Sequence, residues 1–240
     1  MKTNLLALSL VASITSAASS AVVTFSDLAD WRSAAGLPGL DTYSGANLFS
    51  AWSTAEHIED FSSLAVQTTV AGGSISNGTG TWWNWSATNA SAAGSVGIGN
   101  FPSGNTLFAS PTGTSLRFDF SAGTPGGGIV SGVHGFGGNF SFFSASGSDQ
   151  NGRLVIALST GESIVRNFGG ADPFAGFWLT DTTATITSVT VTPFGNAPAG
   201  MFVGAHSLHI GYAGATPIPA PGAMALLGAA GLIASNRRRD

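Results

Sequence analysis

The sequence predicts a mainly β protein: a jelly-roll-like β-sandwich with one short N-terminal helix and a C-terminal transmembrane helix. Roughly ten or more short segments rich in Val, Ile, Phe and Thr follow one another, separated by Gly, Asn, Ser and Pro. Charged residues make up only 8% of the 240 residues, against about 25% in an ordinary globular protein. The chain contains no cysteine, so a disulfide framework is excluded. Together these observations favour an exported β protein over a charge-rich cytosolic enzyme.

Residues 1–21 have the layout of a secretory signal peptide. Lys2 precedes an apolar stretch and then small residues, which allow cleavage after Ala18 or Ala21. The apolar stretch is shorter than the roughly 20 residues that span a bilayer. We therefore expect passage through a Sec-type export machinery. Residues 22–212 would then form one passenger domain, and residues 213–240 a linker with a tail.

The first elements expected after the signal peptide are a short strand and the helix. Residues 22–25 are apolar and β-branched enough for a strand. Residues 26–35 are typical of a helix capped by Ser26, with acidic residues in its first turn. Leu28 and Trp31 share one face of this helix, so we expect that face to be buried.

Strands dominate the rest of the passenger domain. Residues 114–120 alternate between apolar and charged side chains, as in a strand with one buried face. Residues 138–143 are expected to pair with residues 153–158 in a hairpin whose turn ends in Asn-Gly. Apolar positions change phase within residues 184–191, which predicts a β-bulge.

The residues that could carry catalysis are few and poorly placed. His206 and His209 lie three apart on an expected strand, so they should face opposite sides and make poor joint ligands. Glu56, Glu59 and Asp60 could supply paired carboxylates for glycoside hydrolysis. They could equally form a solvated turn or the start of a strand. We expect a protein that is not an enzyme. A secreted polysaccharide hydrolase is kept as the last of three hypotheses, after the sorted passenger and the carbohydrate-binding module described below.

No cofactor, metal or nucleic acid is expected as a partner. Between residues 22 and 217 there are four arginines, no lysine and eleven acidic residues, a formal net charge of −7. This charge disfavours a phosphate backbone as a ligand. Residues 149–152 partly resemble an oxygen-rich calcium loop, but they lack its other acidic positions, and a hairpin turn explains them.

An aromatic cluster at Trp82, Trp83, Asn84 and Trp85 is the candidate binding site. On a strand, Trp83 and Trp85 would share a face with their rings about 7 Å apart. Flat rings at that spacing can stack on sugars, and Asn84 could hydrogen-bond to sugar hydroxyls. The same residues would also suit a strand buried between two sheets, where aromatic side chains supply packing. A carbohydrate-binding module is therefore the second hypothesis.

The end of the chain has three consecutive parts: the segment Ile218, Pro219, Ala220, Pro221, an uncharged apolar run over residues 222–235, and the cluster Arg237, Arg238, Arg239. The two prolines cannot continue a helix and keep the first part extended. As a helix, residues 222–235 span only about 21 Å of the roughly 30 Å hydrocarbon core. The three arginines would hold the C-terminus on the cytoplasmic side.

This tail resembles the PEP-CTERM sorting signals of Gram-negative and related bacteria, with Ala220 where the family pattern has Glu. The resemblance implies export, transient anchoring in the inner membrane and processing by an exosortase. It also implies delivery to the cell surface or extracellular matrix, in association with exopolysaccharide or biofilm. The passenger resembles PEP-CTERM passengers more loosely, at residues 22–25, 59–61 and 137–140. A plain C-terminal membrane anchor is the alternative interpretation of the tail.

Overall fold

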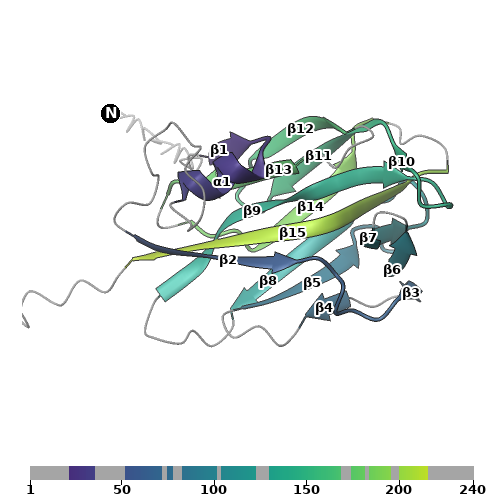
Figure 1. The fold of residues 1–240 in the computed structure, drawn as a ribbon, viewed down its shortest axis with the longest axis horizontal. Coiled ribbons are helices and arrows are strands. Elements are labelled where there is room, and N and C mark those ends of the chain that lie inside the picture. Colours follow the sequence, from purple (N-terminus) through teal and green to yellow (C-terminus); the bar gives the residue numbers. More distant parts are fainter. Residues whose placement is uncertain are drawn as a thin grey trace, which may run out of the picture.

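The structure, a computed structural model, describes residues 22–35, 52–71, 75–77, 83–101, 104–122, 130–168, 174–181, 184–195 and 200–215. These residues form two antiparallel sheets and one helix, so the mainly β prediction is confirmed (Figure 1). The expected signal peptide and the expected transmembrane helix over residues 222–235 lie outside the described residues. Within the described ranges, no helix has the length and apolar character that a membrane crossing requires.

The larger sheet has nine strands. Seven of them form a continuous path in the order β1 (Val22–Phe25), β13 (Phe174–Leu179), β9 (Val130–Phe143), β15 (Phe202–Ala215), β7 (Gly104–Ser110), β6 (Ser95–Phe101) and β3 (Gln67–Ala71). In addition, β10 (Asp149–Gln150) pairs with β9, and β2 (Trp52–Glu59) pairs with β15. The long strands β9 and β15 lie side by side and form the centre of this sheet.

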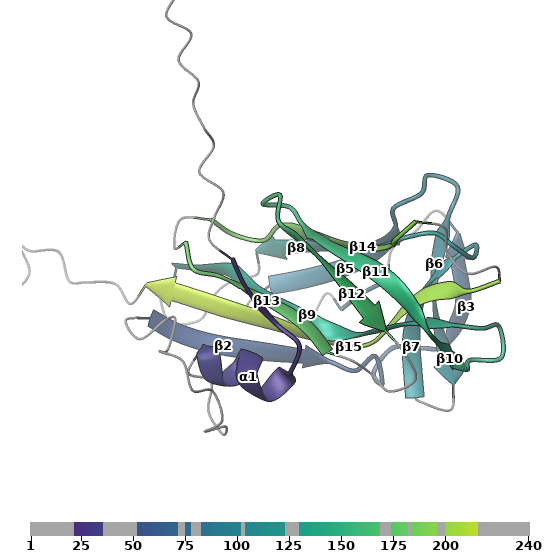
Figure 2. The ribbon, with the colours of Figure 1, turned by 90° about the horizontal axis from the view of Figure 1, so that it is seen from above.

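The smaller sheet has six strands, in the order β12 (Ser163–Phe168), β11 (Gly152–Leu158), β14 (Ser188–Pro193), β8 (Leu116–Ala122), β5 (Trp83–Asn89) and β4 (Ile75–Asn77). Figure 2 shows the two sheets as two layers. Apolar side chains fill the space between the layers, as in a β-sandwich: the ring of Phe118 on β8 lies 5.7 Å from that of Phe136 on β9. The alternation predicted for residues 114–120 is confirmed, because Leu116 and Phe118 are buried while Arg117 is exposed.

Helix α1 (Leu28–Ala34) covers part of the outer face of the nine-stranded sheet (Figure 2). Its N-cap is Asp27, not the predicted Ser26, because an Asp27 carboxylate oxygen accepts the backbone N–H of Asp30. The predicted apolar face is confirmed. Trp31 is fully buried, and its ring stacks on Trp178 of β13 at a centroid distance of 4.8 Å. Strand β13 is consequently buried on both faces.

The hairpin predicted between residues 138–143 and 153–158 is wrong. In the segment that follows β9 along the chain, only Asp149 and Gln150 pair with this strand. The chain then crosses to the other sheet, where β11 pairs with β12 and β14. Gly152 stands at this crossing, and a Cβ atom there would lie 2.2 Å from the Phe142 ring. A glycine thus lets the chain leave the first sheet closely over an aromatic side chain.

The bulge predicted within residues 184–191 is also wrong. Strand β14 begins at Ser188 and pairs with both neighbours without a register shift. Ile186 precedes the strand, and its backbone N–H donates to the carbonyl of Val133 at 2.7 Å. The apparent change of phase therefore marks the start of a strand.

Candidate functional site

The structure places one member of the predicted tryptophan site in the core. Trp82 lies outside the described residues, as do the side chains of Trp83 and Asn84. Trp85 is 2% exposed, and its ring meets Phe61 edge to face at 5.9 Å. Strand β5 turns this side chain toward the opposite sheet, so the buried Trp85 ring offers no surface for a sugar. The packing alternative describes Trp85 correctly.

A β-bulge changes the orientation of the two C-terminal histidines. The pairing of β15 with β9 shifts register between Ala205 and Ser207. His206 and His209 therefore both lie on the outer face of the nine-stranded sheet, and the prediction that they face opposite sides is wrong. They nevertheless contact different partners: His206 lies 2.8 Å from Ser141, and His209 lies 2.7 Å from Glu56.

His206 is the centre of a polar cluster that joins four strands. Its Nε2 lies 2.8 Å from Ser141 Oγ and 3.2 Å from Asp149 Oδ1, and its Nδ1 lies 2.9 Å from Thr106 Oγ1. A hydrolytic triad needs its hydroxyl nucleophile and its carboxylate on opposite nitrogens of the imidazole. Here Ser141 and Asp149 share one nitrogen, and Thr106 is fully buried. The cluster is built to tie strands together and lacks the geometry of a triad.

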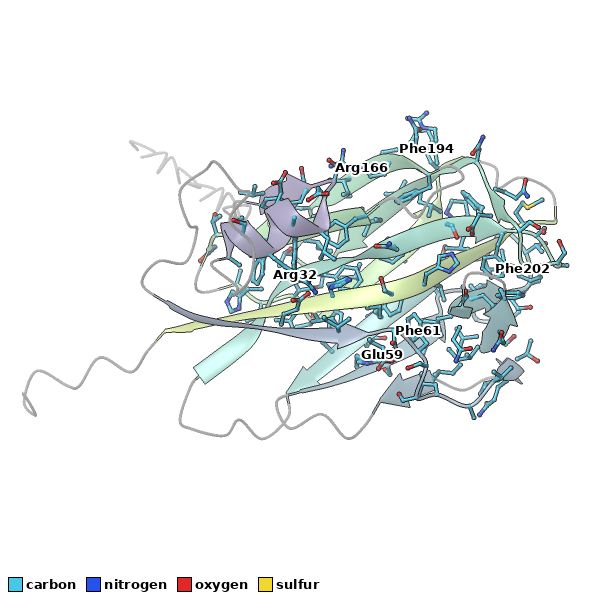
Figure 3. All side chains as sticks on the ribbon, viewed as in Figure 1. Arg32, Glu59, Phe61, Arg166, Phe194 and Phe202 are labelled. Carbon is cyan, nitrogen blue, oxygen red and sulfur yellow. The ribbon has the colours of Figure 1, made fainter. Side chains whose placement is uncertain are left out.

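The predicted carboxylate Glu56 serves to fix α1 to the sheet. Its Oε2 lies 2.7 Å from Arg32 Nε of the helix, and its Oε1 lies 2.7 Å from His209 Nδ1. Figure 3 shows Arg32 between the helix and the strands beneath it. Both carboxylate oxygens are thus engaged by side chains from two different elements.

The other two predicted carboxylates lie at the end of β2 and in the tight turn that follows it. Glu59 is buried and accepts the backbone N–H of Phe61 at 2.8 Å. Asp60 is exposed and accepts the backbone N–H of Ser62 at 2.9 Å. Hydrogen bonds from the Ser62 side chain and backbone hold the pKa of Asp60 below its usual value. Each carboxylate thus has a local structural role, so these groups do not form a facing acid–base pair.

An open hollow on the six-stranded sheet is the best candidate for ligand binding. Its volume is about 420 Å³, and the residues that line it are Asn151, Gly152, Arg153, Asn167 and Phe168. Arg153 on β11 is directly opposite Asn167 on β12, and both are exposed. Directly opposed side chains on one face of a sheet lie about 5 Å apart. A guanidinium and an amide are therefore presented together to solvent.

Phe194 extends this site across a third strand. It follows β14, and its backbone N–H donates to the carbonyl of Arg153 at 2.9 Å. The Arg153 guanidinium carbon lies 4.2 Å from the centroid of the Phe194 ring, a cation–π contact. Figure 3 shows Phe194 at the margin of the domain near β11 and β12, and the side chain is 45% exposed. We name Asn167, Arg153 and Phe194 the Arg153 strip.

The Arg153 strip combines the groups that polar, ring-shaped ligands require. The guanidinium supplies several N–H donors in one plane, and the amide of Asn167 supplies both donors and an acceptor. The exposed ring offers a flat apolar surface. The sequence alone does not predict this site, because strand pairing brings Asn167 and Phe194 to Arg153. The one feature of the sequence that could have indicated the site is Arg153, a residue expected to face outward in a chain with few cationic side chains. Comparisons of the chain with protein-family models, curated proteins and solved structures found no match.

Proposed function

We propose that this chain is an exported, non-enzymatic passenger protein that a C-terminal PEP-CTERM-like tail sorts to the cell surface or extracellular matrix. The observation that carries this proposal is the tail itself, with its Pro-Ala-Pro motif, marginal apolar span and terminal arginines. The resemblance of the tail implies transient anchoring in the inner membrane by a helix over residues 222–235, exosortase processing and association with exopolysaccharide. Residues 1–21 would direct the chain into Sec-type export. The domain preceding the tail would be the cargo.

The architecture of the described domain supports a jelly-roll-like passenger. After β12 the chain changes sheets at each of the next three strands, β13, β14 and β15, the kind of crossing that Greek-key and jelly-roll sandwiches use. Glu56, His206 and His209 are engaged in ties between elements, and Glu59 holds a local turn. These contacts favour a binding or structural role over the polysaccharide hydrolase.

Mass spectrometry of the intact protein released from cells that contain an exosortase tests the sorting proposal. We expect the released chain to lack residues 1–21 and Arg237, Arg238 and Arg239. Replacing both Pro219 and Pro221 with alanine should retain the chain in the membrane fraction. The matched control Pro217→Ala lies just before the motif and should be released normally. Recovery of a released chain that still carries the three arginines would show that the tail is a plain anchor or has another role.

We propose carbohydrate binding as a second function, located at the hollow and the Arg153 strip. The specific observation in its favour is an arginine that lines an open depression together with two asparagines and contacts the exposed ring of Phe194. Trp82, Trp83 and Asn84 remain part of the earlier hypothesis, whereas Trp85 contributes packing. Saccharide titrations of the Arg153 strip variants, described below, test this function.

A further inference from the structure

We propose that the hollow beside Arg153 is a subsite for a carboxylate-bearing sugar, a uronate unit within an acidic polysaccharide. This inference deepens the carbohydrate-binding function and rests on it. It adds the charge class of the ligand, the residue that recognises the charge and the way that residue is held.

The four arginines of the domain differ in their exposure and in whether a carboxylate pairs with them. Arg32 pairs with Glu56, and Arg117 pairs with Asp119 at 2.7 Å. Arg166 is half-buried, and its Nε has no hydrogen-bond partner among the described residues.

Arg153 differs from all three, because it is exposed and has no carboxylate partner within the described part of the chain. In a domain with a formal charge of −7, an exposed cation could readily find an acidic neighbour. Among the described residues Arg153 has no carboxylate beside it, so its guanidinium can pair with an anion from outside.

The contacts of Arg153 place its charge at the hollow. The guanidinium carbon of Arg153 lies over the Phe194 ring, and the backbone hydrogen bond between the two residues ties Phe194 to β11. A stacked guanidinium keeps its in-plane N–H groups free for a bidentate contact with a carboxylate. The side chain loses less entropy on binding because it is already oriented.

The remaining lining suits a sugar ring that carries the carboxylate. The amides of Asn151 and Asn167 can exchange hydrogen bonds with hydroxyls. Of the five described residues that line the hollow, none is acidic. Asp149, two residues before Asn151, is engaged by Ser141 and His206. Among the described lining residues, no carboxylate therefore competes with a bound anion.

The net charge of the domain limits the density of negative charge on the ligand. A polymer with a charge on every unit would be repelled by the rest of the surface, and nucleic acid is disfavoured for the same reason. One arginine is enough for one carboxylate. The fitting ligand is thus a polysaccharide in which uronates are separated by neutral sugars.

Calorimetric titration with a hyaluronan hexasaccharide, in which uronate and neutral sugars alternate, tests the proposal. The comparison ligand is the same hexasaccharide with its carboxylates methyl-esterified. We expect the full chain, purified in mild detergent, to bind the acid form and to bind the ester at least about tenfold more weakly, the difference expected for a charge-assisted hydrogen bond. Arg153→Gln should remove the difference between the two ligands.

The matched control is Arg117→Gln, which removes an exposed arginine of the same sheet that is already paired with Asp119. It should leave the Kd for the acid form unchanged. Phe194→Leu keeps an apolar side chain but removes the ring, and it should weaken binding of the acid form. Unfolding midpoints of all three variants should match the parent chain, because all three positions are exposed.

Each other outcome overturns a defined part of the proposal. Equal binding of acid and ester would refute the uronate subsite and leave carbohydrate binding standing. Equal losses in Arg153→Gln and Arg117→Gln would show non-specific charge attraction. No binding of either ligand would remove both the subsite and the carbohydrate-binding function.

Discussion

Phe61 illustrates how single residues hold an unfavourable backbone conformation in this domain. It has a φ of 60°, in the left-handed region that bulky residues rarely adopt. Its N–H donates to the buried carboxylate of Glu59 at 2.8 Å, and its carbonyl accepts from the side-chain amide of Asn105 at 3.0 Å. The fully buried ring packs against Trp85. These contacts offset a conformational strain of about 1–3 kcal/mol. Figure 3 shows Glu59 and Phe61 together at the end of β2.

Glu59→Ala is predicted to lower the free energy of unfolding by about 1–3 kcal/mol, because the Phe61 N–H would be left buried without an acceptor. Urea unfolding followed by tryptophan fluorescence measures this change. Glu59→Gln keeps an acceptor oxygen and should cost less. The neighbouring control Asp60→Ala removes an exposed carboxylate and should have the smallest effect. A loss in Asp60→Ala as large as that in Glu59→Ala would contradict this explanation.

At the scale of elements, two tryptophans hold α1 against the outer face of the nine-stranded sheet through hydrogen bonds and ring stacking. Trp31 Nε1 donates to the carbonyl of Phe177 at 2.9 Å, and Trp178 Nε1 donates to the carbonyl of Trp31 at 2.9 Å. The Trp178 ring lies over glycines of the two central strands. A Cβ atom would lie 2.7 Å from the ring at Gly135 and 2.2 Å from it at Gly211. These glycines make the room that the aromatic layer needs.

Gly211→Ala is predicted to destabilise the protein by about 1–3 kcal/mol through overpacking against Trp178. A double-mutant cycle with Trp178→Phe gives the sharpest measurement, because the smaller ring makes room for the new methyl group. The alanine should cost less in the Trp178→Phe background than in the parent chain. Equal costs in both backgrounds would show that the ring is not what excludes a side chain at this position.

The elements show which part of the fold local sequence can predict. The α1 helix and the alternation of Leu116, Arg117 and Phe118 depend on neighbouring residues, and both were predicted correctly. The pairing of β9 with β15 and the crossing of β11 to the other sheet depend on partners far along the chain. The bulge before Ser207 belongs to this second class. The bulge reverses which residues of β15 face the core, and the local sequence contains no turn residue that would predict it.

At the scale of the molecule, composition predicted the β class, but the candidate site needed the fold. Low charge and frequent short apolar segments are properties of the whole chain, so they survive errors in individual strands. The Arg153 strip instead requires the order β12, β11, β14, which puts Asn167 and Phe194 on either side of Arg153. The run of tryptophans at residues 82–85 was predicted to be the binding site, but aromatic residues serve packing as often as binding, and sequence alone does not separate the two roles.

The last strand sets the boundary between the passenger and its tail. Strand β15 pairs with β9 and with β2 as far as Ala215, so every residue up to that point contributes to the sheet. A chain that ends at Ala215 should keep the unfolding free energy of the full chain within about 0.5 kcal/mol, because we assign residues 216–240 to the linker and the sorting tail. It should also be absent from the membrane fraction.

A chain that ends at His209 provides the contrast, since it removes the residues that pair with residues 52–57 of β2 and with the start of β9. It should unfold at a lower urea concentration or fail to fold, because backbone groups at the centre of the sheet would lose their partners. Calorimetry and cell fractionation of the two truncated chains together separate folding from targeting. If the chain ending at Ala215 were as unstable as the shorter one, the tail would be part of the folded domain, and a removable sorting tag would be excluded.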